Sequence, residues 1–357
     1  MCNDTLLFSR DLWQMLQAET RDILLYGMGN GADKLLCVLE ARGIPVRGIF
    51  ASDGFVRGHS FHGMRVMSYS EVETLYPPNG CVVLLAFGSS RPEVLALFSR
   101  VSARYPLYVP DLPVCGENLF DAAFFATHAQ KLAAARACLA DDASKQLFDR
   151  VLACKYTAEY PLFEAAVSER RAWDYLTQKE IHAMADLGAY NGDSAREALE
   201  KCPALSFVLA VEPDRRNHKK LSLWAERVEG AEIECHRAAI FDREGEALFD
   251  ASGNRNAGLC TGRESEAVRT ATLDTLLAGR RVDYIKYDVE GAEVPALRGS
   301  TESIRQHHPA LRVALYHRPE DLFTLPLYLR ELCPGYRFYL TREPGVPAWD
   351  LDLIALP

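Results

Sequence analysis

Residues 186–213 constrain the fold of this chain more than any other segment. An apolar run leads into Asp186, and the sequence DLGAYNGD then places Gly188 and Gly192 around a small polar turn. A second apolar run follows and ends in Glu212. This order predicts a strand, a glycine turn, a helix and a second strand with an acid at its tip, the layout of a nucleotide-binding α/β unit.

The residue types in this unit also indicate the kind of ligand. Glycine lets the backbone approach a ligand closely, and an acid at the tip of the second strand accepts hydrogen bonds from ribose hydroxyls. The turn lacks the glycine spacing that cradles a pyrophosphate, and Asp186 would repel an anion. S-adenosylmethionine, which has a positively charged amino-acid end, therefore fits better than NAD. The competing interpretations are an ordinary strand-to-helix turn and, for Glu212, a solvated strand end.

A third segment, residues 282–293, ends a predicted strand in a group of acids. Asp288 and Glu290 follow the strand, and a glycine then breaks the pattern before a helix. Ligands of open α/β sheets bind at the carboxyl ends of the strands, so we expect these acids at the same edge as Glu212. Acids in a first helical turn also favour the helix dipole, which is the interpretation we prefer for Glu293.

The N-terminal part carries a second glycine turn, in the sequence GMGNGA at 27–32. It matches the G-x-G-x-x-A variant of the dinucleotide turn, and Asp53 lies just past the next predicted strand. Predicted strands alternate with predicted helices, which implies a parallel, doubly wound sheet; the strands are 22–26, 46–51 and 82–87, and the helices 33–42 and 91–101. This turn is equally consistent with a working nucleotide site and with a structural relic.

We predict an N-terminal Rossmann-like domain at 1–115, a helical linker at 116–179 and a second domain at 180–357. The linker is rich in Ala, Leu, Phe and Lys and contains almost no glycine. The predicted strands of the second domain are 181–187, 207–212, 233–240, 268–273, 284–289 and 311–317, followed by 336–341 and 351–356. The last two flank a Pro/Gly loop at 344–347, which favours antiparallel pairing.

Composition narrows the function classes. A net charge of −9 argues against a general nucleic-acid surface. The 10 cysteines form no C-x-x-C pair, which indicates reduced thiols and a cytoplasmic protein. The first residues do not have the pattern of a secretory signal, and no apolar run is long enough to span a membrane. We expect a small-molecule or sugar acceptor as partner, no nucleic acid and no membrane; the sequence leaves open a homo-oligomer.

The motifs DLGAYNGD, VEP, DREGE at 242–246, TLD at 272–274 and IKYDVEGAE at 285–293 resemble the FkbM family of S-adenosylmethionine-dependent methyltransferases. The resemblance runs from about residue 183 to the end of the chain. It implies a class I methyltransferase fold, an α/β fold with a seven-stranded Rossmann-like sheet and an antiparallel last hairpin. It also implies methylation of a hydroxyl on a sugar, polysaccharide precursor or natural product. The part before the linker resembles the smaller Rossmann-like domain of sugar-nucleotide enzymes.

The resemblance also implies roles for individual residues. The turn formed by Asp186, Gly188, Ala189 and Gly192 would surround the methionine portion of the cofactor, and Glu212 would bind the ribose. Ile240, Phe241 and Asp242 would flank the adenine, and Asp288 would face the transferred methyl group. Many family members end the fifth strand in Glu before a His, whereas this chain has Tyr316 before His317.

We interpret the chain as an enzyme that transfers a methyl group to a hydroxyl oxygen, with Asp288 and His317 as the candidate bases. Lys286 and Asp288 share one face of their strand, and the sign of the pKa shift of Asp288 does not follow from the sequence. A Mg²⁺ site of Asp288, Glu290 and His317 would suit carboxylate chemistry, but no spacing requires it, and we predict no metal. The alternatives are a nucleotide-sugar binding or sensing protein and an NAD-linked oxidoreductase that uses Gly27, Gly29 and Asp53.

Overall fold

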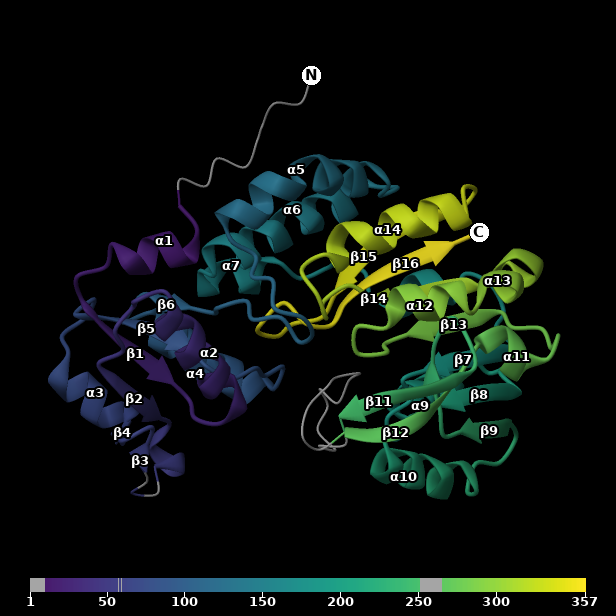
Figure 1. The fold of residues 1–357 in the computed structure, drawn as a ribbon, viewed down its shortest axis with the longest axis horizontal. Coiled ribbons are helices and arrows are strands. Elements are labelled where there is room, and N and C mark those ends of the chain that lie inside the picture. The colour runs from purple at the N-terminus through teal and green to yellow at the C-terminus, as the bar shows by residue number, and fades with distance from the viewer. Residues whose placement is uncertain (1–9, 57, 59, 251–264) are drawn as a thin grey trace.

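The computed structural model describes residues 10–56, 58, 60–250 and 265–357, which form two α/β units joined by a helical segment (Figure 1). The first unit has a six-stranded sheet in the order β3-β4-β2-β1-β5-β6, in which only the β3–β4 pair is antiparallel. Its strands are β1 (Asp22–Tyr26), β2 (Gly48–Ala51), β3 (Ser60–Phe61), β4 (Met64–Ser68), β5 (Cys81–Leu85) and β6 (Leu107–Tyr108). Its helices are α1 (Leu12–Gln17), α2 (Asn30–Ala41), α3 (Tyr69–Leu75) and α4 (Pro92–Ser102), with a 3₁₀ turn η1 (Asp53–Phe55). The predicted parallel sheet is therefore present.

The connecting segment consists of helices packed against the second unit. They are α5 (Ala122–Ala137), α6 (Asp142–Thr157), α7 (Tyr160–Ala165) and α8 (Ala172–Leu176). Asp121 and Asp141 cap the first two by accepting hydrogen bonds from Phe124 and Ser144 backbone amides. Phe148 of α6 is buried in the same hydrophobic cluster as Leu24 of β1 and Phe338 of β15, so this cluster extends from the first unit through the connecting helices to the second unit.

The second unit has a seven-stranded sheet in the order β15-β16-β14-β13-β7-β8-β9. The strands are β7 (Ala183–Leu187), β8 (Phe207–Val211), β9 (Glu232–His236), β13 (Tyr284–Tyr287), β14 (Ala310–Ala314), β15 (Arg337–Arg342) and β16 (Leu351–Leu356). Only β16 runs antiparallel to its neighbours β14 and β15. The seven strands and the antiparallel last hairpin are confirmed. The helices are α9 (Asp193–Lys201), α10 (Arg215–Ala225), α11 (Leu273–Leu277), α12 (Glu293–Arg298), α13 (Thr301–His307) and α14 (Asp321–Leu332).

Two strands expected in this sheet are arranged differently. The strand predicted over 233–240 ends at His236, and the chain then leaves the sheet edge to form β10 (Ala239–Ile240). The strand predicted over 268–273 is β12 (Ser265–Ala271), which ends where Thr272 caps α11. With β11 (Gly245–Asp250), these strands make a separate three-stranded sheet beside the main one. The single strand predicted over 233–240 is thus two strands in two sheets, and β12 lies outside the main sheet, because strand pairing depends on distant neighbours.

The β15–β16 hairpin connects the second unit to the first. The amide of Ser89, after β5, donates to the carbonyl of Val346 at 2.8 Å, and the Val346 amide donates back at 3.0 Å. A side chain on Gly88 would lie 2.8 Å from the ring of Trp349. The hairpin therefore contacts both units. None of the described helices is long and apolar enough to cross a membrane, and the cysteines of the described residues are all free.

Candidate functional site

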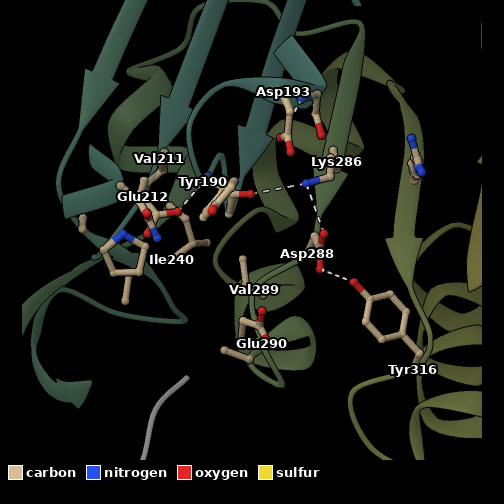
Figure 2. Close-up of a pocket in the computed structure, with 18 of the residues that line it drawn as sticks. Tyr190, Asp193, Val211, Glu212, Ile240, Lys286, Asp288, Val289, Glu290 and Tyr316 are labelled. Carbon is tan, nitrogen blue, oxygen red and sulfur yellow. Dashed lines mark hydrogen bonds and ion pairs between the residues drawn. The ribbon is translucent and has the colours of Figure 1, made fainter. Parts of the chain in front are cut away.

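A cavity opens at the carboxyl ends of β7, β8, β13 and β14, where the three sequence motifs meet (Figure 2). Gly188, Glu212, Ile240 and Asp288 all line it, so the structure brings together one residue from each predicted group. A larger cavity of about 590 Å³ lies at the opposite edge, near the start of β14, but none of the predicted site residues lines it. The predicted site residues that face a cavity therefore face the first one.

The two glycines of the first turn are required for different reasons. Both have positive φ, 84° at Gly188 and 85° at Gly192. A Cβ on Gly188 would lie 1.9 Å from the carbonyl oxygen of Asp288, so glycine is needed here because the backbone passes close to the loop after β13. A Cβ on Gly192 would lie 2.5 Å from the ring of Trp224, and Gly192 is the N-cap of α9. Gly188 lines the cavity, whereas Gly192 and the fully buried Ala189 support the turn from behind.

Glu212 is held in place at the tip of β8. One carboxylate oxygen accepts a hydrogen bond from the amide of Tyr190 and the other from the amide of Asp214, each at 2.8 Å. The residue is 6% exposed and faces the cavity, so each oxygen keeps a further lone pair for a ligand. Burial raises the pKa of Glu212 to about 7, against the effect of the two amides.

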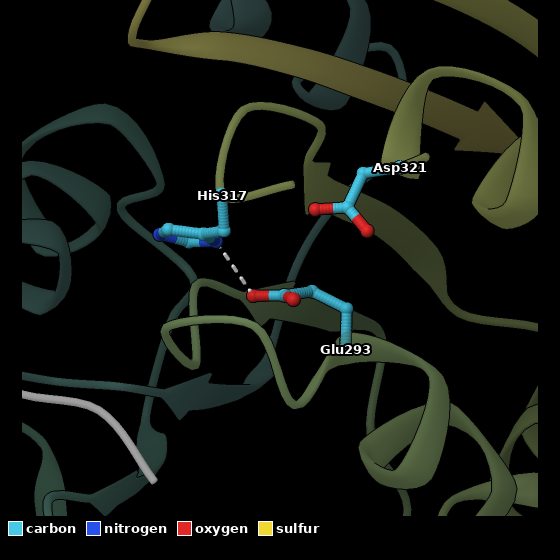
Figure 3. Close-up of side chains that lie close together, drawn as sticks. All are labelled: Glu293, His317 and Asp321. Atoms are coloured by element: carbon cyan, nitrogen blue, oxygen red, sulfur yellow. Dashed lines mark ion pairs between the residues drawn. The ribbon is translucent and has the colours of Figure 1, made fainter. Parts of the chain in front are cut away.

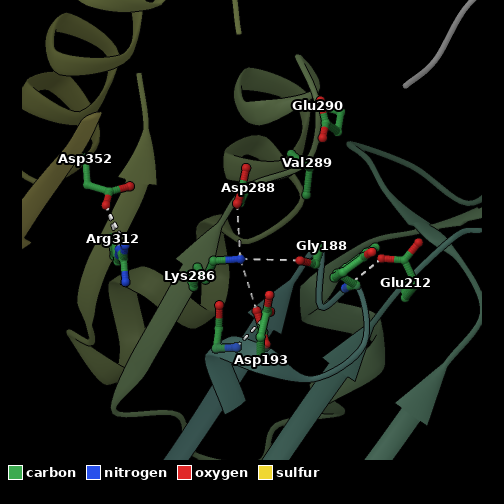
Figure 4. Close-up of polar contacts among 12 residues, drawn as sticks. Gly188, Asp193, Glu212, Lys286, Asp288, Val289, Glu290, Arg312 and Asp352 are labelled. Carbon is green, nitrogen blue, oxygen red and sulfur yellow. Dashed lines mark hydrogen bonds and ion pairs between the residues drawn. The ribbon is translucent and has the colours of Figure 1, made fainter. Parts of the chain in front are cut away.

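A line of alternating charges runs through the base of the cavity (Figure 4). Nζ of Lys286 lies 3.5 Å from Asp186 and 3.3 Å from Asp288, and it donates to the carbonyl of Gly188 at 3.3 Å. Asp186 is fully buried, and burial raises its pKa to about 6 although Lys286 favours its charged form. Asp186 therefore reaches the cavity through Lys286, which lines it.

Asp288 is the best-paired acid of the site. It contacts Lys286, accepts a hydrogen bond from the Tyr316 hydroxyl at 2.9 Å and lies 3.4 Å from Nε2 of His317. Burial disfavours its charged form, but Lys286, His317 and Tyr316 outweigh burial and lower the pKa of Asp288 to about 2. Asp288 is a stable anion with little affinity for a proton.

His317 lies behind the cavity wall in a cluster with Glu293 and Asp321 (Figure 3). Nδ1 of His317 is 2.8 Å from Glu293, and all three residues are buried. Burial opposes the charge on the ring, but Glu293, Asp288 and Glu290 outweigh it and raise the pKa of His317 to about 10. Side chains of these types also bind metals, but here both carboxylates have partners in the backbone. Glu293 accepts a hydrogen bond from the Val289 amide, and Asp321 accepts one from the Arg318 amide. We interpret the cluster as a charged brace beneath the loop after β13.

The predicted adenine side is only partly exposed to the cavity. Ile240 lines the cavity, whereas Phe241 and Asp242, which follow β10, do not line it. Oδ1 of Asp242 lies 3.9 Å from the guanidinium of Arg243. Several lining side chains received no role from the sequence. Tyr190 and Asp193 stand in the DLGAYNGD motif and Tyr316 precedes His317, whereas tertiary folding brings Asn217, Arg312 and Asp350 to the cavity.

The N-terminal glycine turn is organised differently. The ring of Phe87 lies against Gly27, where a Cβ would be 2.4 Å from it. Both oxygens of Asp53 are engaged by Ser70, at 3.0 Å from its amide and 2.6 Å from its hydroxyl. The acid that would bind a nucleotide ribose in the oxidoreductase alternative thus already has partners within the fold.

Comparison with known proteins identifies the second unit. Residues 186–338 match the methyltransferase FkbM domain, so the resemblance predicted for this part of the chain is confirmed. The resemblance of the first unit to sugar-nucleotide enzymes stays a prediction. No curated protein sequence matches the chain.

Among solved structures, the methyltransferase FkbM from Methylobacillus flagellatus KT aligns with a TM-score of 0.71 and 20% identity, over 94% of this chain and 89% of that one. It shows that the fold of nearly the whole chain is shared. The precorrin-6y C5,15-methyltransferase from Geobacter metallireducens GS-15 aligns at 9% identity and TM-score 0.33 over 55% of this chain and 87% of that one. Aeropyrum pernix fibrillarin, solved with natively bound S-adenosyl-L-methionine, aligns at 13% identity and TM-score 0.31 over 50% of this chain and 66% of that one.

Proposed function

We propose that this chain, with its methyltransferase FkbM domain, binds S-adenosylmethionine in the cavity beside Glu212 and transfers the methyl group to a hydroxyl oxygen of a sugar, polysaccharide precursor or natural product. One observation carries the cofactor assignment. The carboxylate of Glu212 is oriented by two backbone amides while facing a cavity, which is the arrangement that recognises a pair of ribose hydroxyls.

The cavity residues fit the rest of the cofactor. The side chain of Asn217 is buried at the wall, and its Oδ1 has no hydrogen-bond partner among the described residues, so it can accept a bond from a ligand. Asp193 would bind the ammonium group, and Lys286 and Arg312 the carboxylate of the amino-acid end. Asp186 would act on this end through Lys286, and Gly188, Ala189 and Gly192 would shape the turn around it. Ile240, Phe241 and Asp242 would lie on the adenine side.

The cofactor supplies a methyl group on a positively charged sulfur. The residues of the chain hold the acceptor oxygen in line and keep the surroundings negative, because acids at this edge favour a sulfonium over a neutral ligand. Asp288 would orient the acceptor hydroxyl as a permanent anion, and His317 would fix Asp288 and Glu290 from behind. A neutral alcohol is a weak nucleophile, so a proton acceptor is also needed.

Calorimetry with S-adenosylhomocysteine tests the cofactor site. Glu212→Gln keeps the shape of the side chain but removes its charge, and the loss of charge-assisted bonds to the ribose lowers affinity by about 30-fold or more. Glu229→Gln, at an exposed position of similar chemistry, is the control and binds as the wild type does. Equal affinities of the two variants would refute the assignment of Glu212. Transfer of tritium from methyl-labelled S-adenosylmethionine to saccharide fractions then tests the acceptor class; label in amines instead of hydroxyls would refute O-methylation.

A further inference from the structure

One acid of the cavity, Glu290, has no task in the cofactor assignment. It lines the cavity, and its Oε2 atom is buried without a hydrogen-bond donor among the described residues. The nearest cation, Nε2 of His317, is 3.5 Å away and lies closer to Asp288. A buried carboxylate oxygen without a donor is costly to keep charged, so such a group has a reason to be there.

The backbone holds this side chain in an unusual conformation. Glu290 has φ of 52°, in the left-handed region that residues other than glycine seldom adopt. Its carbonyl accepts a hydrogen bond from the thiol of Cys115 at 3.1 Å, and a Cβ on the next residue, Gly291, would lie 3.0 Å from Cys115. The segment between β6 and α5 therefore holds this turn in place. Backbone strain that surrounding contacts maintain in this way is typical of functional sites.

The charged groups around Glu290 come from several elements. Asp288 follows β13, Glu293 begins α12, His317 follows β14 and Glu212 follows β8. Arg318 packs against Gly291, and burial raises the pKa of the Cys115 thiol to about 12, which keeps it neutral. Burial, together with repulsion from Asp288, Glu293 and Glu212, outweighs His317 and raises the pKa of Glu290 to about 8. Asp288 and His317 keep fixed charges at neutral pH, whereas Glu290 does not.

We propose that Glu290 is uncharged in the free protein, releases its proton when the sulfonium of S-adenosylmethionine binds, and then serves as the base for the acceptor hydroxyl. This proposal rests on the proposed function. In the transfer, the hydroxyl oxygen forms a bond to the methyl carbon, the carbon–sulfur bond breaks with its electron pair going to sulfur, and the hydroxyl proton goes to the Glu290 carboxylate. The cofactor thereby prepares the base, so the base is charged only when the methyl donor is in place.

Proton release on binding tests this without an identified acceptor. At pH 7, a carboxyl group with a pKa near 8 carries roughly 0.9 proton, and a positive charge about 5 Å away lowers the pKa by about two units. S-adenosylmethionine should then release about 0.8 proton more than S-adenosylhomocysteine, which lacks the positive charge. Calorimetry of both ligands in buffers of different ionisation enthalpy measures this difference for the wild type, Glu290→Gln and the exposed control Glu229→Gln.

The difference between the two ligands should be larger by about 0.8 proton in the wild type and in Glu229→Gln than in Glu290→Gln. Any proton released by Glu212, whose pKa is about 7, or by the amino group of the cofactor is common to the wild type and the variant and cancels in this comparison. A second readout uses only the wild type: the affinity ratio of S-adenosylmethionine to S-adenosylhomocysteine should rise about sixfold per pH unit around pH 7. Equal proton release by both ligands, a flat ratio, or a difference as large in Glu290→Gln as in the wild type would overturn the inference. Failure of both ligands to bind the wild type would instead refute the proposed function.

Discussion

Replacement of Arg342 by Met should destabilise the protein more than a change at any exposed arginine. Arg342 is the last residue of β15 and is fully buried. Its guanidinium donates to the carbonyls of Phe163 at 3.1 Å and of Ala166 in the linker, and to those of Gly345 and Pro347 in the hairpin, the last at 3.5 Å. No carboxylate in the described part of the chain forms an ion pair with it. The side chain thus joins the linker to the hairpin that contacts the first unit.

The expected loss of stability follows from the buried carbonyl groups that the substitution leaves without donors. Methionine fills much of the volume, but the carbonyls lose charged donors inside the core, and loss of one partner from such a buried network costs about 3–5 kcal/mol. Arg337→Met, on the same strand but exposed, should change the free energy of unfolding by less than about 0.5 kcal/mol. Urea unfolding followed by tryptophan fluorescence compares the two, since Trp349 lies in the hairpin. Equal midpoints for both variants would refute the idea that this network stabilises the fold.

Three further outcomes are expected. Lys155→Met should lower the free energy of unfolding by about 3–5 kcal/mol, because it leaves Asp111, 2.9 Å away and buried, without a counter-charge; adding Asp111→Leu should recover most of the loss in the same urea assay. The pKa of His317 is raised from 6.5 to about 10, so its charged form contributes stability that is complete below pH 6.5 and is lost as pH rises through 10. The difference in melting temperature between the wild type and His317→Gln should therefore shrink from pH 7 to pH 10. A difference that stays constant would contradict the role of His317 as a charged brace. A chain reduced to residues 180–357 should lack a cooperative melt by near-ultraviolet circular dichroism, since it loses the linker helices that bury β15, whereas residues 109–357 should retain one.

The sequence was most informative where a strand is long, apolar and central. Asp22–Tyr26 and Leu351–Leu356 have the predicted bounds, because both are buried along nearly their whole length and end at clear turn residues. The short strands β3 and β6, of two residues each, leave no periodic signal. Strand β12 has the predicted character but pairs with β10 and β11 outside the main sheet. Sheet membership depends on partners far along the chain, and local pattern does not encode it.

The residues of the candidate site were likewise predictable from the sequence only in part. Gly188, Glu212 and Asp288 follow strands at one edge, so the topology of an open α/β sheet was sufficient to group them. Arg312 and Asp350 reach the cavity from β14 and the hairpin, and neither stands in a motif. Even the glycine turn has a cause outside its own sequence, since Gly188 is required by the carbonyl of Asp288.

The ionisation states of the acids depend most on the tertiary structure. Asp288 and Glu290 are two residues apart and belong to one motif, yet the pKa of one is lowered to about 2 and that of the other is raised to about 8. The difference comes from Lys286 and Tyr316, which contact Asp288 but make no contact of this kind with Glu290. A motif therefore locates the acids, and the pairing decides which of them can change charge. Of these two acids only Glu290 can change charge when a cation binds, so the response to S-adenosylmethionine should depend on Glu290 rather than on Asp288, which the resemblance placed at the methyl group.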